Sequence, residues 1–354
     1  MDQPADRPSI SVIVPAVNEE ATIGRAISPL LADPLGAGLE VVVAVGPSTD
    51  RTREIVAGMA ERDPRIRLVD NPARITPEGL NAAIRASRGR VILRMDGHAE
   101  PDPGYVSACI EALEASGAWN VGGRIRKVGL TAAARAAAAA TSSPFGIGGG
   151  RRFHLLTEPQ NVDTLWPGCW PRWVFERVGL FDPEMVQNQD DELNQRIVDA
   201  GGTIRFDPRI SAVYLSRGSW PGLFRQYFRY GLFKIRGFQK RPGLLRPRHL
   251  VPAVMVAGAT GALVLAAWTP WGLVVFGLGA AVWLGAALVF GRRVAPDHHA
   301  TLGGVVAAYA CLHAGYGLGT WVGLVRFGGR WFIDRAGSVP RLDALADQDP
   351  GRAG

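Results

Sequence analysis

Short apolar runs alternate with amphipathic stretches through the first third of the chain. The apolar runs are rich in Val, Ile and Leu, as buried strands are, and they cover residues 10–17, 39–46, 65–71 and 90–97. The stretches between and after them space apolar residues as one face of a helix would, at residues 18–31, 48–62, 76–88 and 103–117. Strands that alternate with helices predict an α/β fold with a Rossmann-like, mostly parallel sheet and helices on both faces.

The alternation continues less regularly up to residue 240. We expect a fifth strand at 119–128 and a further strand at 204–215. Helical spacing of apolar residues predicts helices at residues 131–143, 171–179, 189–202 and 219–240, the last of them basic, aromatic and amphipathic. Residues 144–152 are PFGIGGGRR and predict a glycine-rich loop that lacks the spacing of a phosphate-binding P-loop.

The last third of the chain is far more apolar. Residues 250–268 and 271–290 carry no charged side chain, and both have the length of a membrane span. Trp268 and Trp271 flank the short turn between them, as interfacial anchors do. These features predict an N-terminal α/β domain, a basic linker, a membrane segment and a polar tail, at residues 1–240, 241–249, 250–326 and 327–354.

The pattern is compatible with either two or three membrane spans. Arginines precede the first apolar run and follow the second, which fits a two-span hairpin with both ends in the cytoplasm. Residues 301–325 are apolar as well, and they either cross as a third span or form a re-entrant or interfacial helix. His313 and the many glycines of this stretch favour a helix that does not cross.

The charge and the cysteine content indicate which classes of partner the protein binds and in which compartment it lies. The formal net charge is +7, which suits a phosphorylated substrate or an anionic membrane surface. The three cysteines are scattered, so neither a disulfide framework nor a zinc site is indicated. Because the N-terminal segment is polar and no secretory signal is recognised, we expect the N-terminal domain to lie in the cytoplasm. We expect no nucleic-acid partner.

Polar clusters follow three of the predicted strands, at residues 15–18, 46–50 and 96–98. In sheets of this kind, ligands bind beyond the carboxyl ends of the strands. In the third cluster, Asp96 and His98 lie two residues apart, a spacing that lets both side chains hold one divalent cation. The same residues, in the sequence RMDGH, also fit an ordinary turn at the end of a strand.

A second candidate site begins the helix predicted at 189–202. Asp190, Leu193 and Arg196 fall on one helix face, so Leu193 can anchor the helix while Asp190 projects from its N-terminus. The helix dipole favours an ionised carboxylate there. Simple charge complementarity explains the same pattern, and the neighbouring Asp191 competes for the role. Residues 226–230, QYFRY, favour a membrane-interface helix, although Arg229 could instead reach a diphosphate.

Taken together, the ordered motifs resemble the family 2 glycosyltransferases of GT-A fold. The motifs are SVIVPAVNEE, an STDRT loop, the acid of LRMDGHAEP, the acid-plus-LxxR helix and QxxRY. The likeness covers about residues 9–240. It is strongest to bacterial membrane enzymes of exopolysaccharide synthesis, such as the succinoglycan type, through LRMDGHAEP, VDTLWPGCWPRWVFERVGLFDP and the C-terminal spans.

The resemblance implies roles for the matching residues. It assigns donor nucleotide binding to Pro15, Asn18, Glu19, Asp50, Asn81 and Arg94. It makes Asp96 the first acid of the DxD metal motif, with His98 in place of the second acid and with Mn²⁺ or Mg²⁺ as cofactor. Asp190 matches the general base. It assigns diphosphate and acceptor binding to Trp170, Asp191, Gln226, Arg229 and Tyr230.

Three positions depart from the family pattern. Val45 stands where an aspartate usually contacts the base or ribose, so the nucleotide is less well specified. Gln189 replaces the glutamate of the ED pair, although the aspartate of that pair is kept. His98 makes the metal site one charge less negative and is expected to weaken metal binding where the imidazole protonates.

The resemblance implies an inverting transfer of a sugar from a UDP- or GDP-sugar to a lipid-linked or glycan acceptor. We expect the protein at the bacterial inner membrane, as a multi-pass protein that contributes to cell-envelope polysaccharide. Two other classes stay open. A nucleotidyltransferase can share the sheet and the paired metal ligands, and it would release pyrophosphate. A non-catalytic membrane partner of a transferase would show no metal-dependent binding of a sugar nucleotide.

Overall fold

The computed structural model describes residues 9–148, 156–216, 218–331 and 339–342. They form two compact units. The first comprises Met1–Arg126, Phe153–Tyr214 and Ala336–Gly354, and the second comprises Lys127–Arg152 and Leu215–Arg335. Residues 149–152 of the predicted glycine-rich loop and most of the predicted tail lie outside the described residues.

The first unit is built on a 9-stranded sheet with the order β3-β2-β1-β4-β8-β6-β9-β5, and β7 pairs with β9. The first four strands in this order are parallel and coincide with the apolar runs of the sequence. They are β1 (Ile10–Ala16), β2 (Leu39–Val45), β3 (Ile66–Asp70) and β4 (Val91–Arg94). The parallel strands predicted from the apolar runs are therefore confirmed.

The other half of the sheet is antiparallel where its pairing is defined. Strand β8 (Cys169–Pro171) pairs with β4 and with β6 (Asn120–Gly129). Strand β9 (Ile204–Ser216) pairs with β5 (Ala99–Pro101) and β7 (Gln160–Asn161). The sheet is thus mixed, which corrects the expectation of a mostly parallel one. The sequence did not show this because β5, β7 and β8 are too short to display a period.

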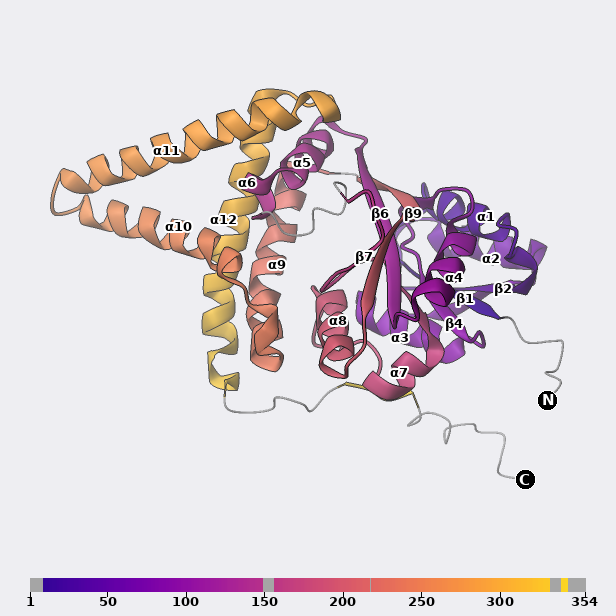
Figure 1. The fold of residues 1–354 in the computed structure, drawn as a ribbon. Helices are drawn as coiled ribbons and strands as arrows, with labels where there is room; N and C mark the ends of the chain where they lie inside the picture. The colour runs from indigo at the N-terminus through magenta and orange to yellow at the C-terminus, as the bar shows by residue number, and fades with distance from the viewer. Residues whose placement is uncertain (1–8, 149–155, 217, 332–338, 343–354) are drawn as a thin grey trace. The chain divides into compact units, whose positions relative to one another are not determined.

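Helices cover both faces of this sheet (Figure 1). One apolar cluster joins the sheet to α1 (Ile23–Leu31), α2 (Thr52–Arg62) and α4 (Tyr105–Ser116). The other joins it to α3 (Thr76–Ala86), α7 (Arg172–Val178) and α8 (Gln189–Asp199). In β1, Val12 and Val14 belong to the first cluster and Ile13 to the second. Successive strand residues point to opposite faces, so the sheet separates the two cores.

The second unit is helical. Its elements are α5 (Ala132–Ser142), α6 (Pro144–Ile147), α9 (Trp220–Lys240), α10 (Pro247–Leu265), α11 (Trp271–Val294) and α12 (Leu302–Phe327). Helices α9 and α12 lie side by side, whereas α10 and α11 lead away from them and meet at their far ends (Figure 1).

Glycines allow the close approach of α12 to α9. A Cβ at Gly315 or Gly323 would lie 2.7 Å from a carbonyl oxygen of α9, and one at Gly319 would clash with the Phe228 carbonyl. These positions repeat every fourth residue and so lie on one face of α12. Because of this packing, α9 belongs to the same compact unit as the apolar helices. The units therefore divide the chain elsewhere than at the domain boundary predicted at residue 240.

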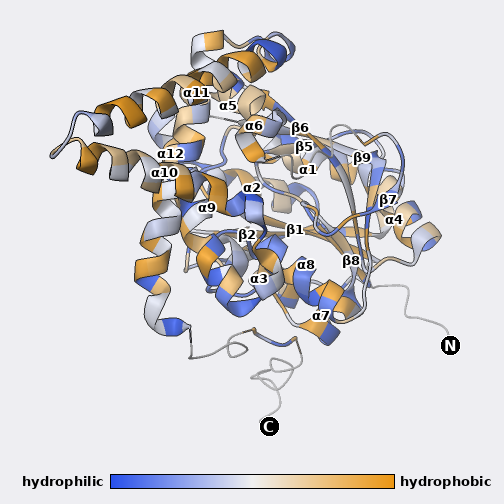
Figure 2. Ribbon diagram, turned by 60° about the vertical axis from the view of Figure 1, so that its left-hand side comes forward, coloured by the Kyte–Doolittle hydropathy of each residue, from blue (hydrophilic) through white to orange (hydrophobic). Residues whose placement is uncertain are grey.

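Three helices are long and apolar enough to cross a membrane, within Pro247–Leu265, Trp271–Val294 and Leu302–Arg330. Figure 2 shows that α10 and α11 are apolar along most of their length. The third helix is unbroken over Leu302–Phe327, and the two alternatives for residues 301–325, a third span or a re-entrant or interfacial helix, stay predictions. His313 has a structural contact there, because its Nδ1 accepts a hydrogen bond from the Trp283 indole at 3.0 Å.

We predict that Gly319→Ala destabilises the helical unit by about 1–3 kcal/mol, because the new methyl group has no room beside the Phe228 carbonyl. The measurement is the thermal unfolding midpoint of the detergent-solubilised protein. Gly303→Ala is the matched control on the same helix, since a Cβ there would meet nothing within 4 Å. The control should be neutral or slightly stabilising because alanine favours helix more than glycine does. Equal effects of the two changes would contradict the packing role.

Candidate active site

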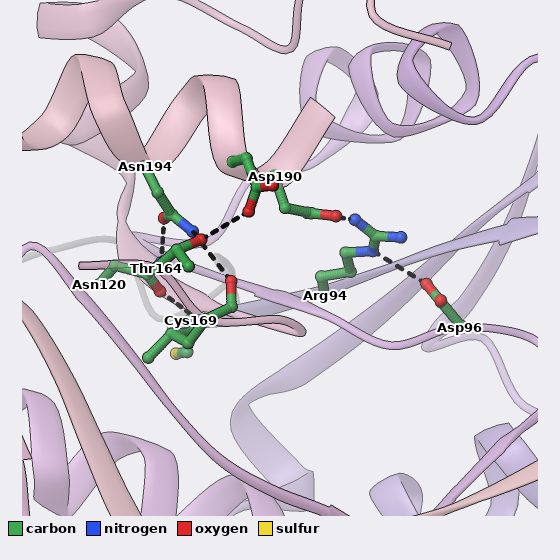
Figure 3. Close-up of polar contacts among 9 residues, drawn as sticks. Arg94, Asp96, Asn120, Thr164, Cys169, Asp190 and Asn194 are labelled. Carbon is green, nitrogen blue, oxygen red and sulfur yellow. Dashed lines mark hydrogen bonds and ion pairs between the residues drawn. The ribbon is translucent and has the colours of Figure 1, made fainter. Parts of the chain in front are cut away.

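A single guanidinium joins the two carboxylates that were singled out as metal ligand and base. Arg94 is the last residue of β4, and its Nε donates to Asp96 Oδ1 at 2.9 Å. Its Nη1 donates to Asp190 Oδ1, at the start of α8 (Figure 3). The structure thus brings together the end of β4 and the N-terminus of α8, which lie 96 residues apart in the sequence.

Arg94 is buried, with 2% of its surface exposed. Burial alone would lower the pKa of its guanidinium, but the charges of Asp190 and Asp96 raise the pKa above its usual value. Arg94 therefore remains a cation between two carboxylates. Its Nε and Nη1 donate to these two acids, and its contact with the donor nucleotide stays a prediction.

His98 lies in the turn after β4, beside Asp96. Its Nδ1 is 2.7 Å from Glu19 Oε1, and Thr22 Oγ1 donates to Glu19 Oε2 at 2.9 Å. Burial would lower the pKa of the imidazole, but the hydrogen bond to Glu19 and the charges of Asp96 and Glu19 raise it. Among the described residues no partner contacts His98 Nε2, so this nitrogen is available to a ligand. Glu19 thus contacts His98, and its predicted role in nucleotide binding stays a prediction.

The loops after β1 and β2 are bonded to each other. The Thr49 amide donates to Asn18 Oδ1 at 2.8 Å, and the Glu20 amide donates to Asp50 Oδ2 at 3.1 Å. Burial raises the pKa of Asp50, but hydrogen bonds from Thr52 and from the Glu20 amide outweigh it and lower the pKa. Asn18 and Asp50 therefore shape the loops at this sheet edge, as the polar clusters of the sequence suggested. Their nucleotide contacts stay a prediction.

The structure separates the two adjacent aspartates of α8. Asp191 is buried, and Thr164 Oγ1 donates to its Oδ1 at 2.9 Å. Asn194 donates to the same Thr164 hydroxyl at 3.0 Å, and Asn120 donates to Asn194 at 2.8 Å, as Figure 3 shows. Asp191 thus belongs to a buried polar network, whereas Asp190 faces Arg94. This arrangement favours Asp190 over Asp191 as the residue that could act as a base.

Helix α8 is held firmly, as the spacing of its residues suggested. Leu193 and Ile197 are fully buried in the second apolar cluster. The Arg196 guanidinium pairs with Glu192 at 2.8 Å and donates to the Leu180 carbonyl at 2.7 Å. These contacts fix the helix from which Asp190 projects.

Two predicted ligand-binding residues lie in the core instead. Trp170 on β8 is 1% exposed and packs against Phe175 and Phe181. Asn81 on α3 is fully buried, and its side-chain amide bonds the N–H and the carbonyl of Phe181 at 2.9 and 2.8 Å. Both assignments came from the order of the motifs alone, which does not reveal the side of the sheet that a residue faces.

We predict that Asn81→Leu lowers the free energy of unfolding by about 1–3 kcal/mol for each Phe181 backbone group that is left unsatisfied. Donor affinity should stay unchanged, because Asn81 has no exposed atom. Thermal unfolding in detergent and titration with sugar nucleotides give the two readouts. A loss of donor affinity without a loss of stability would restore Asn81 to the nucleotide site.

Aromatic residues that the sequence analysis did not single out lie beside the charged cluster. The Tyr214 ring is 4.4 Å from the His98 ring and 5.4 Å from that of Trp166, centroid to centroid. The Arg94 guanidinium carbon lies 5.8 Å from the Trp166 ring centre. The one available signal was TLWPGCW, in which two tryptophans lie four residues apart, and Trp166 rather than Trp170 lies at the site.

Residues of the predicted QxxRY element lie on α9, in the second unit. Gln226 Nε2 donates to the Tyr230 hydroxyl at 3.1 Å, and both Gln226 and Arg229 are exposed. Pro15 lies within β1, opposite Ala44 of β2. The ligand-binding roles of Pro15, Gln226, Arg229 and Tyr230 stay predictions.

The cluster offers a divalent cation a carboxylate and an imidazole. Within the described part of the chain, no three His, Cys, Asp or Glu side chains gather as a metal site. Asp96 and His98 nevertheless fit a cation that takes most of its ligands from a bound diphosphate and water, as Mg²⁺ does at many phosphate-transfer sites. Glu19, bonded to Nδ1 of His98, leaves the Nε2 nitrogen for the metal, which is a common arrangement for metal-binding histidines.

Comparison with known proteins agrees with this geometry. The model of "Glycosyl transferase family 2" matches residues 11–172. The succinoglycan biosynthesis protein ExoA of Rhizobium meliloti is 30% identical over 328 residues, which are 89% of this chain and 95% of that protein. ExoO of the same organism is 38% identical over 112 residues, 31% of each chain.

A solved structure shows the same fold over most of the chain. The mannosyltransferase PcManGT from Pyrobaculum calidifontis, in complex with GDP-Man and Mn²⁺, matches with a TM-score of 0.55 at 20% identity. The match covers 89% of this chain and 88% of that one. At this identity the likeness establishes the GT-A type of fold and nothing finer.

Proposed function

The chain belongs to glycosyl transferase family 2, and from that premise we propose that it transfers a sugar from a UDP- or GDP-sugar to a lipid-linked or glycan acceptor. The relative named for succinoglycan biosynthesis supports a role in the synthesis of cell-envelope polysaccharide. The structural neighbour in complex with GDP-Man and Mn²⁺ supports a nucleotide diphosphate sugar as donor.

The observation that carries the proposal is the placement of Asp96 and Asp190 on one guanidinium. At the carboxyl end of the sheet, Arg94 pairs both with Asp96, the proposed metal ligand, and with Asp190, the proposed general base. In a single displacement the acceptor hydroxyl attacks the sugar carbon from the side opposite the departing diphosphate, so a transferase needs a base and a metal-binding acid that both lie near that carbon. A non-catalytic partner would have no use for this arrangement.

Asp190 is proposed as the general base. Its carboxylate would accept the proton of the acceptor hydroxyl while the hydroxyl oxygen forms a bond to the anomeric carbon and the bond to the diphosphate oxygen breaks. One displacement with one base inverts the anomeric centre. Arg94 positions the Asp190 carboxylate through their ion pair.

Asp96 and His98 are proposed to hold Mn²⁺ or Mg²⁺, which when bound would neutralise charge on the leaving diphosphate. Glu19 would orient the His98 ring for this role. We propose Trp166 and Tyr214, in place of Trp170, as the aromatic surface against which a sugar ring packs. Gln226, Arg229 and Tyr230 are kept as candidates for diphosphate and acceptor contacts.

The compartment is proposed from the apolar helices and the relatives. Helices able to span a membrane suit an acceptor that is carried on a lipid. We propose that the protein lies in the bacterial inner membrane. The first unit, which bears the candidate active site and is called the catalytic unit from here on, would lie at the cytoplasmic face, where sugar nucleotides are made.

Donor binding tests the proposal. The purified protein in detergent is titrated with UDP- and GDP-sugars, with and without Mn²⁺. We expect binding of one donor class that requires the metal and is lost in Asp96→Ala. The matched control is Asp102→Ala, because Asp102 pairs with Arg126 at the surface. Absence of metal-dependent binding would favour a non-catalytic partner, and pyrophosphate release from nucleoside triphosphates would favour a nucleotidyltransferase.

A further inference from the structure

We propose that the chain crosses the membrane twice between the catalytic unit and residues 339–342, through α10 and α11, and that α12 lies at the membrane surface against α9. The proposal places the tail on the same side of the membrane as the catalytic unit. It does not depend on the reaction that the catalytic unit performs.

The tail is bonded to the first unit. The Leu180 amide donates to the Pro340 carbonyl at 2.8 Å, and Leu342 packs against the second apolar cluster of the sheet. Gly179 provides room for this contact, since a Cβ there would lie 2.6 Å from Val339 Cγ1. A segment that contributes to a folded core cannot lie across a bilayer from that core.

Chain connectivity then determines that the number of membrane crossings between the catalytic unit and the tail is even. The path from the catalytic unit to the tail passes through α9, α10, α11 and α12 in turn. A path that returns to its starting side crosses an even number of times. Three helices in this path are long and apolar enough to cross, so at most two of them cross and at least one does not.

Helix α9 is not the missing span. It carries no acidic residue, and its basic residues are spread along its length, at Arg225, Arg229, Lys234, Arg236 and Lys240. A basic side chain near the centre of a membrane helix costs about 2.5–3.5 kcal/mol. Helix α9 therefore stays at the surface.

Helix α12 has the same position relative to the membrane as α9. Gly315, Gly319 and Gly323 bring its backbone against that of α9 over successive turns. A crossing α12 would draw the basic side chains of α9 into the hydrocarbon, so the two helices remain at the surface together. The exposed apolar side chains of α12 would then rest on lipid, at Leu318, Trp321, Val322 and Val325.

The hairpin of α10 and α11, in contrast to α9, is uncharged over most of its length and exposes apolar side chains. No charged residue occurs between 250 and 290, and Val254, Leu278 and Val282 are each more than 60% exposed. The two helices lead away from α12 and join each other at the far end (Figure 1). There, Trp268 and Trp271 are 78% and 69% exposed, as expected of anchors in the distant headgroup layer.

Site-directed labelling tests this arrangement. Single cysteines replace Arg341 in the tail, Arg62 on α2 and Ala267 at the hairpin turn, all of them exposed, in a Cys311→Ser background in which the remaining cysteines are buried. An impermeant maleimide is applied to sealed right-side-out and inverted vesicles. We expect Arg341→Cys and Arg62→Cys to react from one side and Ala267→Cys from the other. Labelling of Arg341→Cys together with Ala267→Cys would overturn the proposal.

Hydrogen exchange of the full-length protein in detergent tests the tail contact itself. The Leu180 amide should exchange slowly in the wild type and at least tenfold faster in Leu342→Asp, which detaches the tail. The amide of Met95, bonded to the Ile13 carbonyl inside the sheet, serves as the internal reference and should not change. Equal exchange of the Leu180 amide in both proteins would overturn the docking on which the parity argument rests.

Discussion

Replacing Asp190 with asparagine is expected to slow sugar transfer by about 10²- to 10⁴-fold, the usual contribution of a general base. The amide keeps the size of the side chain and its bond to Arg94 but cannot accept the proton of the acceptor. Donor affinity should change little, because the proposed metal ligands Asp96 and His98 are untouched. Initial rates with saturating donor, together with donor titration, separate the two effects.

Asp191→Asn is the matched control for that variant. An asparagine oxygen can still accept the hydrogen bond of Thr164, so the polar network around α8 should persist. We expect transfer within a few fold of the wild type. Equal losses in the two variants would mean that α8, rather than the Asp190 carboxylate, is what the reaction needs.

Replacing Arg94 with methionine should both destabilise the catalytic unit and abolish transfer. Removing one member of a buried charge cluster costs about 3–5 kcal/mol, since the remaining charges lose their partner. The side chains of Arg94, Asp96 and Asp190 are only 3%, 9% and 14% exposed, so water compensates little. Denaturant unfolding of the detergent-solubilised protein measures the change.

Arg25→Met provides the comparison for that loss. Arg25 also pairs with a carboxylate, Glu100, but its side chain is 56% exposed, and exposed pairs contribute about 0–1 kcal/mol. Arg94→Lys should restore part of the stability but not full activity, because lysine keeps the charge and loses the forked geometry. If Arg94→Met were as stable as Arg25→Met, the buried cation would not organise the site.

The parallel half of the fold could be predicted because each strand is a continuous apolar run between helices. The antiparallel half could not, since strands as short as β5 and β8 have no period and their partners lie far away in the sequence. The positions of the candidate site residues Asp96, His98 and Asp190 could be predicted from general rules as well. Ligands gather where parallel strands end, and an acid at a helix start can project from it.

What sequence could not supply was the pairing of side chains across the fold. The bond between Arg94 and Asp190 can be identified only once α8 is placed beside β4, and the contact between Glu19 and His98 only once the loops after β1 and β4 are placed together. Trp166 and Trp170 have the same chemistry and differ only in direction, one towards the charged cluster and the other into the core. The glycines of α12 favoured a helix that does not cross the membrane, and in the structure Gly315, Gly319 and Gly323 allow close packing against α9.

The most direct test of the account is turnover by the purified protein in detergent. UDP- and GDP-sugars are supplied one at a time with Mn²⁺ and a bacterial lipid extract as acceptor, and released nucleoside diphosphate is measured. The account predicts release from one donor that requires the metal and is lost in both Asp96→Ala and Asp190→Asn. Metal-dependent release that continues undiminished in Asp190→Asn would contradict the assignment of the base and, with it, the proposed mechanism.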